Sequence, residues 1–239
     1  MSGFQRAVVF GAAGGIGRAL TEALATRVEV VHAVGRRLEA LPTGANILRH
    51  QADITDEAQI EALLPALGTP DLVIVATGVL SDAKTGLTPE KTYRQQDMQA
   101  FEQVFRSNTF GPALVAKHLL DLMPRDRRTV FAALGARVGS ISDNRLGGWH
   151  AYRASKAALV MLMRNYAIER ARKAPEAICV CLHPGTVRSA LSAPFQANVP
   201  EGKLFEPAFA AAALLEVLDG LRPQDSGKQF DYAGREIPF

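Results

Sequence analysis

The sequence has 239 residues, of which 48% are hydrophobic and 21% are charged, and its formal net charge is +3. This composition supplies the core of one large soluble domain, and no apolar run is long enough to predict a membrane span. The basic residues are scattered without interleaved aromatic residues, which argues against a nucleic-acid-binding surface.

The two cysteines, Cys179 and Cys181, are two positions apart in an apolar run. They do not form a Cys-x-x-Cys motif and no cluster of metal-ligand residues accompanies them. We therefore interpret them as core cysteines of a reducing compartment and predict no metal site. Because the N-terminus also lacks a signal-peptide pattern, we expect a cytoplasmic protein.

Residues 4–10 form a short apolar run that predicts a buried parallel strand. A turn with Gly11, Gly15 and Gly17 follows, and a helical sequence continues from Arg18. Glycines in such a turn let the main chain approach a pyrophosphate, and the helix N-terminus offers unpaired N–H groups. The arrangement favours a dinucleotide site, although a plain tight turn uses the same residues.

A second apolar run at residues 28–34 completes a β-α-β unit. In NAD-binding folds an acidic residue usually follows this strand and binds the ribose hydroxyls. This chain has Arg36 and Arg37 there, and a guanidinium group binds a phosphate through paired hydrogen bonds. We predict NADP(H) rather than NAD(H), with Arg36 as the first candidate; the alternative is a solvent-facing loop arginine.

Residues 46–51 predict a third strand and residues 56–67 an amphipathic helix. Between them, Asp53 either binds the adenine amino group or caps the turn. Residues 71–76 predict a fourth strand that ends in Thr77-Gly78, where small residues would let a cofactor pass. Ligands of open parallel sheets bind at these carboxyl ends of the strands.

Residues 79–96 are polar and predict a surface loop. Asp97 is expected to cap a long helix that ends near residue 122. Asn108 and the Gly-Pro pair shortly after it are unfavourable inside a helix. The conflict indicates either a functional position or a packed kink.

Strands and helices continue to alternate to the end of the chain. Strands are expected at residues 128–134, 177–182 and 228–232, helices at 150–173 and 206–221, and loops at 135–149 and 185–204. The loop at 185–204 is expected to close over substrate. The pattern predicts one doubly wound Rossmann-type α/β domain, residues 1–239, with a parallel sheet of about seven strands flanked by helices.

Tyr152 and Lys156 stand four residues apart in a predicted helix, so both side chains lie on one helix face. An ammonium group beside a phenol favours the phenolate and is expected to lower the pKa of the tyrosine. The pair would then act as a proton donor next to a nicotinamide, which predicts carbonyl reduction or its reverse. An exposed tyrosine and a solvated lysine are the alternative.

At this point the sequence resembles the short-chain dehydrogenase/reductase family over nearly its full length. The motifs that carry the resemblance are Gly11-x-x-x-Gly15-x-Gly17, Asp53, Ala76-Thr77-Gly78, Asn108, Tyr152-x-x-x-Lys156 and Pro184-Gly185-Thr186-Val187. Within the family, Gly139-Ser140-Ile141, Gly147-Gly148-Trp149 and the end of the chain from Asp231 are similar to the branch that contains C-factor, sniffer and carbonyl reductases.

The resemblance implies roles for individual residues. Tyr152 would be the general acid/base, Lys156 would lower its pKa and hold the nicotinamide ribose, and Asn108 would bind a water that links Lys156 to solvent. The implied cofactor contacts are Gly11, Ala13, Gly15, Ile16, Gly17, Arg36, Asp53, Ile54, Thr77, Gly78, Pro184, Gly185, Val187 and Ser189, with Tyr152 and Lys156. The family also implies a homodimer or homotetramer formed through the helices of Asn108 and Tyr152.

One departure from the family pattern affects the predicted chemistry. The family places a catalytic serine just after the fifth strand, where this chain has Gly135 and Ala136. Neither side chain can donate a hydrogen bond, so we expect Ser140, or else Ser142, to reach the substrate oxygen instead. The loss of such a donor costs about a hundredfold or more in rate.

These features predict an NADP(H)-dependent oxidoreductase that reduces a small carbonyl substrate or oxidises an alcohol. The alternative is a dinucleotide-binding signalling or regulatory protein with little turnover, which the missing serine and the resemblance to C-factor favour.

Overall fold

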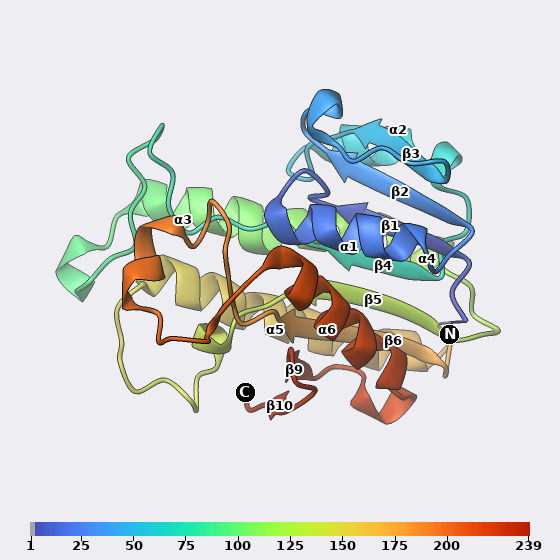
Figure 1. Cartoon of the computed structure of the whole chain (residues 1–239). Coiled ribbons are helices and arrows are strands. Elements are labelled where there is room, and N and C mark those ends of the chain that lie inside the picture. Colours follow the sequence, from blue (N-terminus) through green and yellow to red (C-terminus); the bar gives the residue numbers. More distant parts are fainter. Residues whose placement is uncertain (1–2) are drawn as a thin grey trace.

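The computed structural model describes residues 3–239, apart from the side chain of Asn198, and its centre is an eight-stranded sheet (Figure 1). The strands lie in the order β10-β9-β6-β5-β4-β1-β2-β3. Their bounds are β1 Arg6–Phe10, β2 Val30–Gly35, β3 Ile47–Gln51, β4 Leu72–Val75, β5 Thr129–Leu134, β6 Ala177–His183, β9 Gln229–Asp231 and β10 Glu236–Ile237. Neighbouring strands are parallel except at the edge, where β10 runs antiparallel to β9.

Helices cover both faces of the sheet. Their bounds are α1 Gly15–Ala25, α2 Glu57–Leu67, α3 Met98–Phe105, α4 Gly111–Leu122, α5 His150–Ala171 and α6 Pro207–Gly220. Figure 1 shows α1 and α6 side by side on one face, and the buried residues of α2, α4 and α5 join one apolar cluster on the other. The central strands are apolar on both sides because these two layers enclose them, whereas the edge strand β3 is partly exposed. The predicted doubly wound α/β fold is therefore confirmed, with β10 as an additional edge strand.

The helix predicted at residues 97–122 is divided in two. Asp97 caps α3 as expected, since its carboxylate accepts a hydrogen bond from the Ala100 N–H at 3.0 Å. A π-helical turn at Arg106–Phe110 then separates α3 from α4. Such turns occur where helical hydrogen bonding is locally disrupted, often at functional sites. The unfavourable Asn108 thus marks a real break in the helix.

The segment at residues 185–204, predicted to be a loop, contains a small second sheet. Strands β7 (Thr186–Val187) and β8 (Leu204–Phe205) pair in parallel, and a 3-10 helix at Ala193–Asn198 lies between them. Elements this short carry no periodic sequence signal, which is why the sequence did not reveal them. The pairing ties the segment to the start of α6.

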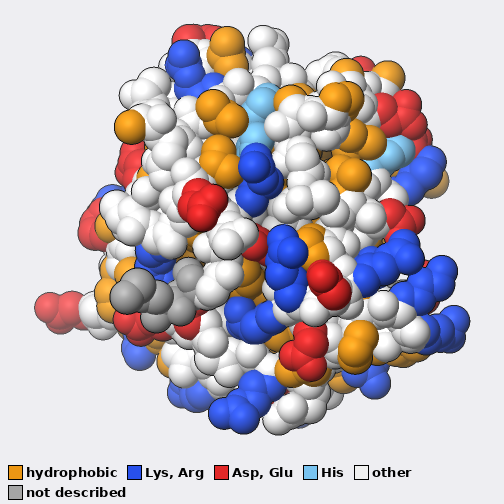
Figure 2. Space-filling view, turned by 90° about the vertical axis from the view of Figure 1, so that its right-hand side faces the viewer, with side chains coloured by type: hydrophobic (Ala, Val, Ile, Leu, Met, Phe, Trp, Pro, Cys, Tyr) orange, Lys and Arg blue, Asp and Glu red, His pale blue; other side chains and the backbone are white. Residues whose placement is uncertain are grey.

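The face at the amino ends of the strands lies opposite the glycine-rich turn. Figure 2 shows that acidic and basic side chains are interspersed on this face. No helix within residues 3–239 is long and apolar enough to cross a membrane.

The buried His32 and its half-buried neighbour His50 let us predict how the free energy of unfolding depends on pH. His32 of β2 lies with its Nε2 3.0 Å from Arg6 Nη1 and its Nδ1 2.9 Å from His50 Nε2. Because the guanidinium only donates, His32 Nε2 must accept, and the neutral ring donates from Nδ1 to His50. Burial, the neighbouring His50 and Arg6 lower the pKa of His32 to about 4, and burial does the same for His183.

The unfolded chain therefore binds protons between pH 6.5 and 4 that the native state does not bind. Unfolding free energy should fall as pH falls through this window, by about 1.4 kcal/mol per pH unit for each such histidine. Urea unfolding at pH 7, 5.5 and 4.5 measures the slope. His32→Gln, which keeps an acceptor for Arg6 and a donor for His50, should reduce the slope; an unchanged slope would contradict the assignment.

Candidate active site

The glycine-rich turn after β1 is built so that only glycine fits at two positions. Gly11 has a φ of 83° and donates its N–H to Val34 O at 2.9 Å. A Cβ on Gly11 would lie 3.0 Å from Thr77 Cγ2, and a Cβ on Gly17 would overlap the Gly11 carbonyl oxygen. The turn therefore packs tightly between the ends of β1 and β4 and leads directly into α1.

The start of α1 is free to accept an anionic ligand. The helix begins at Gly15, and no side chain caps its first N–H groups. Ser189 lies beside the start of α1, with its Cβ 3.5 Å from the position that a Cβ on Gly15 would take. Nearby, the Thr77 hydroxyl is buried and has no hydrogen-bond partner among the described residues. The uncapped helix and the orphaned hydroxyl fit a phosphate-bearing ligand.

The other predicted contacts of the turn lie around it. Ala13 is exposed, and its Cβ lies 3.7 Å from a Cβ position on Gly35 at the end of β2. Arg36 follows directly, is exposed, and forms no ion pair with any residue in 3–239. Ile16 is half-buried and its side chain packs against the apolar cluster on the α1 and α6 face of the sheet, so a cofactor contact through its main chain stays a prediction. Arg36 is therefore free to bind a phosphate beside the turn.

Asp53 uses its carboxylate within its own turn. Its Oδ1 accepts hydrogen bonds from the N–H and the hydroxyl of Thr55, both at 2.9 Å. The turn-capping alternative is thus observed, and an adenine contact stays a prediction. Ile54 is buried against Gly111 at the start of α4, where a Cβ would lie 2.6 Å from Ile54 Cδ1. That close contact explains the glycine after the π-helical turn.

Asn108 connects three parts of the site. Its Oδ1 accepts from the Val79 N–H at 2.7 Å, and its Nδ2 donates to Val79 O at 2.9 Å and to Ser155 Oγ at 3.1 Å. The side chain therefore holds the segment after β4 against α5. Both side-chain N–H donors of Asn108 are used and its oxygen already accepts one hydrogen bond. The water-binding role stays a prediction. Gly78 lies here too, with a Cβ position 3.5 Å from Asn108 Oδ1 and 3.6 Å from Lys156 Nζ.

Tyr152 and Lys156 are both buried on one face of α5. Lys156 is 3% exposed, its Nζ donates to Leu134 O at 2.7 Å, and the same atom lies 5.9 Å from the centroid of the Tyr152 ring. Burial lowers the pKa of Lys156 to about 8. The surface alternative for this pair is excluded.

The expected lowering of the tyrosine pKa was wrong. Burial raises the pKa of Tyr152 to about 12. The desolvation of the phenol outweighs the lysine charge, because the ammonium is directed at the Leu134 carbonyl rather than bonded to the phenol oxygen. Tyr152 is therefore a neutral hydroxyl group near pH 7.

The neighbourhood of Tyr152 is apolar. Leu80 and Ala136 are buried against it, and the Trp149 ring packs edge-on at 6.2 Å between centroids. Phe195, from the segment between β7 and β8, packs on Trp149 at 5.1 Å. This surrounding suits an apolar or aromatic substrate better than a charged one.

The hypothesis that Ser140 replaces the missing serine is not supported by the geometry. The Ser140 hydroxyl accepts from the Asp143 N–H at 3.1 Å, and Ser140 lines a separate cavity of about 270 Å³ with Met161 and Arg164. The Ser142 hydroxyl donates to the main-chain oxygen of Phe239. Of the two positions where the family places its serine, Ala136 is buried in the same apolar cluster as Tyr152, so this position holds a methyl group.

The segment after β6 forms the remaining wall. Pro184 is buried, and Gly185 has a φ of 76° and lies so close to Phe205 that a Cβ would be 2.7 Å from the ring. The carbonyl of Val187 accepts a hydrogen bond from Ser192 Oγ at 2.5 Å. The small sheet of β7 and β8 thus fixes Val187 and positions Ser189 near α1.

Glu90 is a site residue that the sequence did not reveal, because residues 79–96 contain no periodic or motif signal. Its carboxylate is 5% exposed and accepts from the Ala151 N–H at 3.2 Å, while its main-chain oxygen accepts from the Trp149 N–H at 2.5 Å. Trp149 has a φ of 51° and cannot cap α5 itself. Glu90 therefore caps the start of α5 at the N–H of Ala151, one residue before Tyr152.

Replacing Glu90 by alanine should lower the unfolding free energy by about 0.5–2 kcal/mol, the usual cost of a lost cap, and should reduce turnover because Tyr152 loses its anchor. Glu90→Gln keeps an oxygen that accepts from the Ala151 N–H, so it should retain most of the unfolding free energy and most of the turnover. Urea unfolding and NADPH oxidation measure the two effects. Equal losses in both variants would show that the carboxylate acts in another way.

Comparisons with known proteins agree with this geometry. The family model described as short chain dehydrogenase matches residues 5–200. The chain therefore belongs to the short chain dehydrogenase family, whose members are oxidoreductases.

Individual relatives lie in the branch that the sequence predicted. The chain is 34% identical to the C-signal protein of Myxococcus xanthus over 144 residues, which cover 60% of this chain and 81% of that protein. A short-chain dehydrogenase/reductase from Burkholderia multivorans with bound NADP superposes with a TM-score of 0.83 at 24% identity, covering 99% and 100% of the two chains. The carbonyl reductase Sniffer of D. melanogaster superposes with a TM-score of 0.84 at 18% identity, and the match covers 98% of this chain and 99% of that chain.

Proposed function

We propose that this protein is an NADP(H)-dependent oxidoreductase that reduces a carbonyl group or oxidises the corresponding alcohol. The observation that carries the proposal is the burial of Tyr152 and Lys156, with the Lys156 ammonium bonded to the Leu134 carbonyl at the carboxyl end of β5. The uncapped start of α1 follows the carboxyl end of β1 in the same parallel sheet. The neighbour with bound NADP supports the choice of cofactor. The dinucleotide, when bound, supplies or accepts the hydride.

The chain's own residues would bind, orient and exchange the proton. Tyr152 donates its hydroxyl proton to the substrate oxygen, and Lys156, whose pKa is about 8, is largely protonated at neutral pH and stabilises the phenolate that results. Asn108 holds the walls of the site together. The proposed cofactor contacts are Gly11, Ala13, Gly15, Ile16, Gly17, Arg36, Asp53, Ile54, Thr77, Gly78, Pro184, Gly185, Val187 and Ser189, with Tyr152 and Lys156.

A titration with NADPH and NADH side by side, followed by NADPH oxidation with a panel of apolar ketones, aldehydes and quinones, tests this function. The apolar cluster around Tyr152 and the similarity to a carbonyl reductase favour that panel. Tight NADPH binding with turnover of a panel member is the expected result. Absence of NADPH binding would refute the proposal.

Arg36 should determine the preference between the two cofactors. Arg36→Ala removes the charged hydrogen bonds to the 2′-phosphate, worth about 1.5–3 kcal/mol, so NADPH affinity should fall roughly 10- to 100-fold while NADH affinity changes little. Arg37→Ala, at the next exposed position, is the matched control and should have a smaller effect. Equal losses for NADPH and NADH would show that Arg36 does not recognise the phosphate.

The proposal also covers the domain organisation, the location and the assembly of the protein. We expect one domain over residues 1–239, a cytoplasmic location, and a homodimer or homotetramer that uses the helices of Asn108 and Tyr152. Size-exclusion chromatography with light scattering measures the assembly.

A dinucleotide-binding regulator with little turnover is the second candidate. Two observations favour it: the similarity to the C-signal protein, and Ala136 in place of a hydrogen-bond donor beside Tyr152. It predicts tight NADPH binding without reduction of any member of the carbonyl panel. Robust turnover would exclude it.

A further inference from the structure

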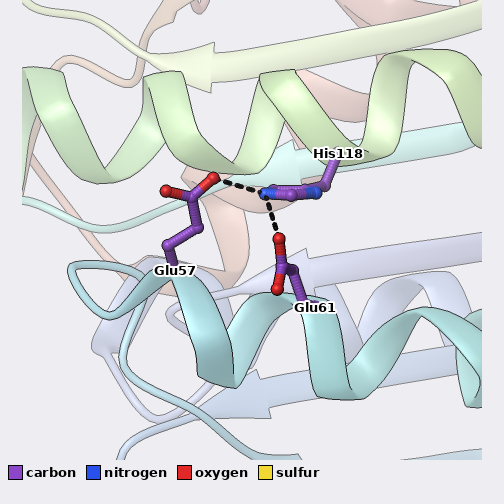
Figure 3. A group of neighbouring side chains, drawn as sticks. All are labelled: Glu57, Glu61 and His118. Carbon is purple, nitrogen blue, oxygen red and sulfur yellow. Dashed lines mark hydrogen bonds and ion pairs between the residues drawn. The ribbon is translucent and has the colours of Figure 1, made fainter.

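A cluster of three potential metal ligands lies away from the candidate active site. Glu57 and Glu61 project from one side of α2 toward His118 of α4 (Figure 3). His118 Nε2 is 2.9 Å from Glu57 Oε1 and 3.8 Å from Glu61 Oε1. One ligand atom of each residue lies within 4.8 Å of the other two. The two glutamates lie together because residues four positions apart share one helix face. The packing of α4 on α2 brings His118 to them.

The chemistry of these donors matches one class of cation. A neutral imidazole nitrogen with two carboxylate oxygens is a ligand set used by zinc, which binds such atoms at about 2.0–2.2 Å. Magnesium and calcium prefer sites made of oxygen ligands alone. The His118 side chain is 12% exposed and Glu61 58%, so the imidazole is held in place while the solvent side stays open for a water ligand.

Lys117 is the group that a metal ion would have to displace. Its Nζ lies 2.5 Å from Glu57 Oε1, the same oxygen that contacts His118. The lysine side chain is 62% exposed, and an exposed ion pair of this kind contributes little to stability. An ammonium ion and a divalent cation therefore compete for one carboxylate, and the lysine can move into solvent.

We propose that Glu57, Glu61 and His118 form a binding site for a divalent transition-metal ion of the Zn²⁺ class, in competition with the Lys117 ammonium. A bound ion joins α2 to α4. These helices already meet where Ile54, just before α2, packs on Gly111 at the start of α4. The site therefore stabilises the native state and does not depend on the catalytic chemistry.

Calorimetric titration of the full chain, without a histidine tag, with ZnCl₂ tests the proposal. We expect binding of one Zn²⁺, a rise in melting temperature with Zn²⁺, and no response to Mg²⁺. His118→Gln and Glu61→Gln should each weaken binding by at least about tenfold, because each removes a direct ligand. Lys117→Met keeps all three ligands and removes the competing charge, so it should bind Zn²⁺ more tightly than the natural chain.

Asp121→Asn is the matched control, because Asp121 lies on the same helix and pairs with Arg125 outside the cluster. It should bind Zn²⁺ as the natural chain does. No Zn²⁺ binding, or equal binding by the natural chain and His118→Gln, would overturn the site. If Lys117→Met bound Zn²⁺ with unchanged affinity, the proposed competition between Zn²⁺ and the Lys117 ammonium for Glu57 would be wrong.

Discussion

Replacing Tyr152 by phenylalanine should abolish carbonyl reduction while leaving NADPH binding in place. The change removes only the hydroxyl, and the ring keeps its contacts with Leu80, Ala136 and Trp149. A positioned general acid contributes about 10²- to 10⁴-fold to rate. The other acidic group beside the ring, the Lys156 ammonium, is directed at the Leu134 carbonyl. The measurement is the rate of NADPH oxidation at saturating substrate, together with a fluorescence titration of NADPH.

Tyr166→Phe is the matched control for this experiment. Tyr166 is on the same helix, is half-buried, and packs edge-on against Phe131 at 6.4 Å between centroids. Removal of its hydroxyl should leave turnover unchanged. If Tyr152→Phe kept substantial turnover while Tyr166→Phe behaved as expected, the proton would have to come from another group, and the proposed role of Tyr152 would be wrong.

The fold could be predicted from the sequence because its signals are local. Buried parallel strands appear as short apolar runs, such as residues 71–76, and the positions of Gly11 and Gly17 follow from a turn that has no room for a Cβ. The edge strand β10 escaped prediction because two residues carry no periodicity. The parallel order of the strands then places the glycine turn and Tyr152 at the same end of the sheet, where the strands have their carboxyl ends.

The site was predicted less completely because its details depend on contacts between distant segments. Glu90 caps α5 across 61 positions of sequence, and no local pattern encodes that contact. The raised pKa of Tyr152 is caused by its burial, which depends on residues far apart in the sequence such as Leu80 and Ala136, and spacing alone does not fix this. Ser140 was favoured by its hydroxyl group, yet it follows the 3-10 turn at Arg137–Gly139 and lines another cavity.

Returning a serine to position 136 should increase turnover. The Ala136 methyl group packs on Tyr152, so a hydroxyl at this position can donate to the same substrate oxygen that receives the tyrosine proton. A hydrogen-bond donor placed on a developing oxyanion contributes about 10²- to 10³-fold in kcat. We expect Ala136→Ser to raise kcat by at least tenfold on a reducible ketone, with a smaller change in KM, because the new bond strengthens in the transition state.

Gly135→Ser separates this effect from the mere presence of a serine in the loop. A Cβ on Gly135 would lie 3.1 Å from Cys181 Cβ and 3.5 Å from Gln229 Cδ, so the added side chain would face β6 and β9. That variant should lose stability and gain no activity. An increase in Ala136→Ser alone would identify position 136 as the missing donor. If Ala136→Ser left kcat unchanged in a protein that depends on Tyr152, the substrate oxygen would already have a second donor, and Ala136 would not limit the rate.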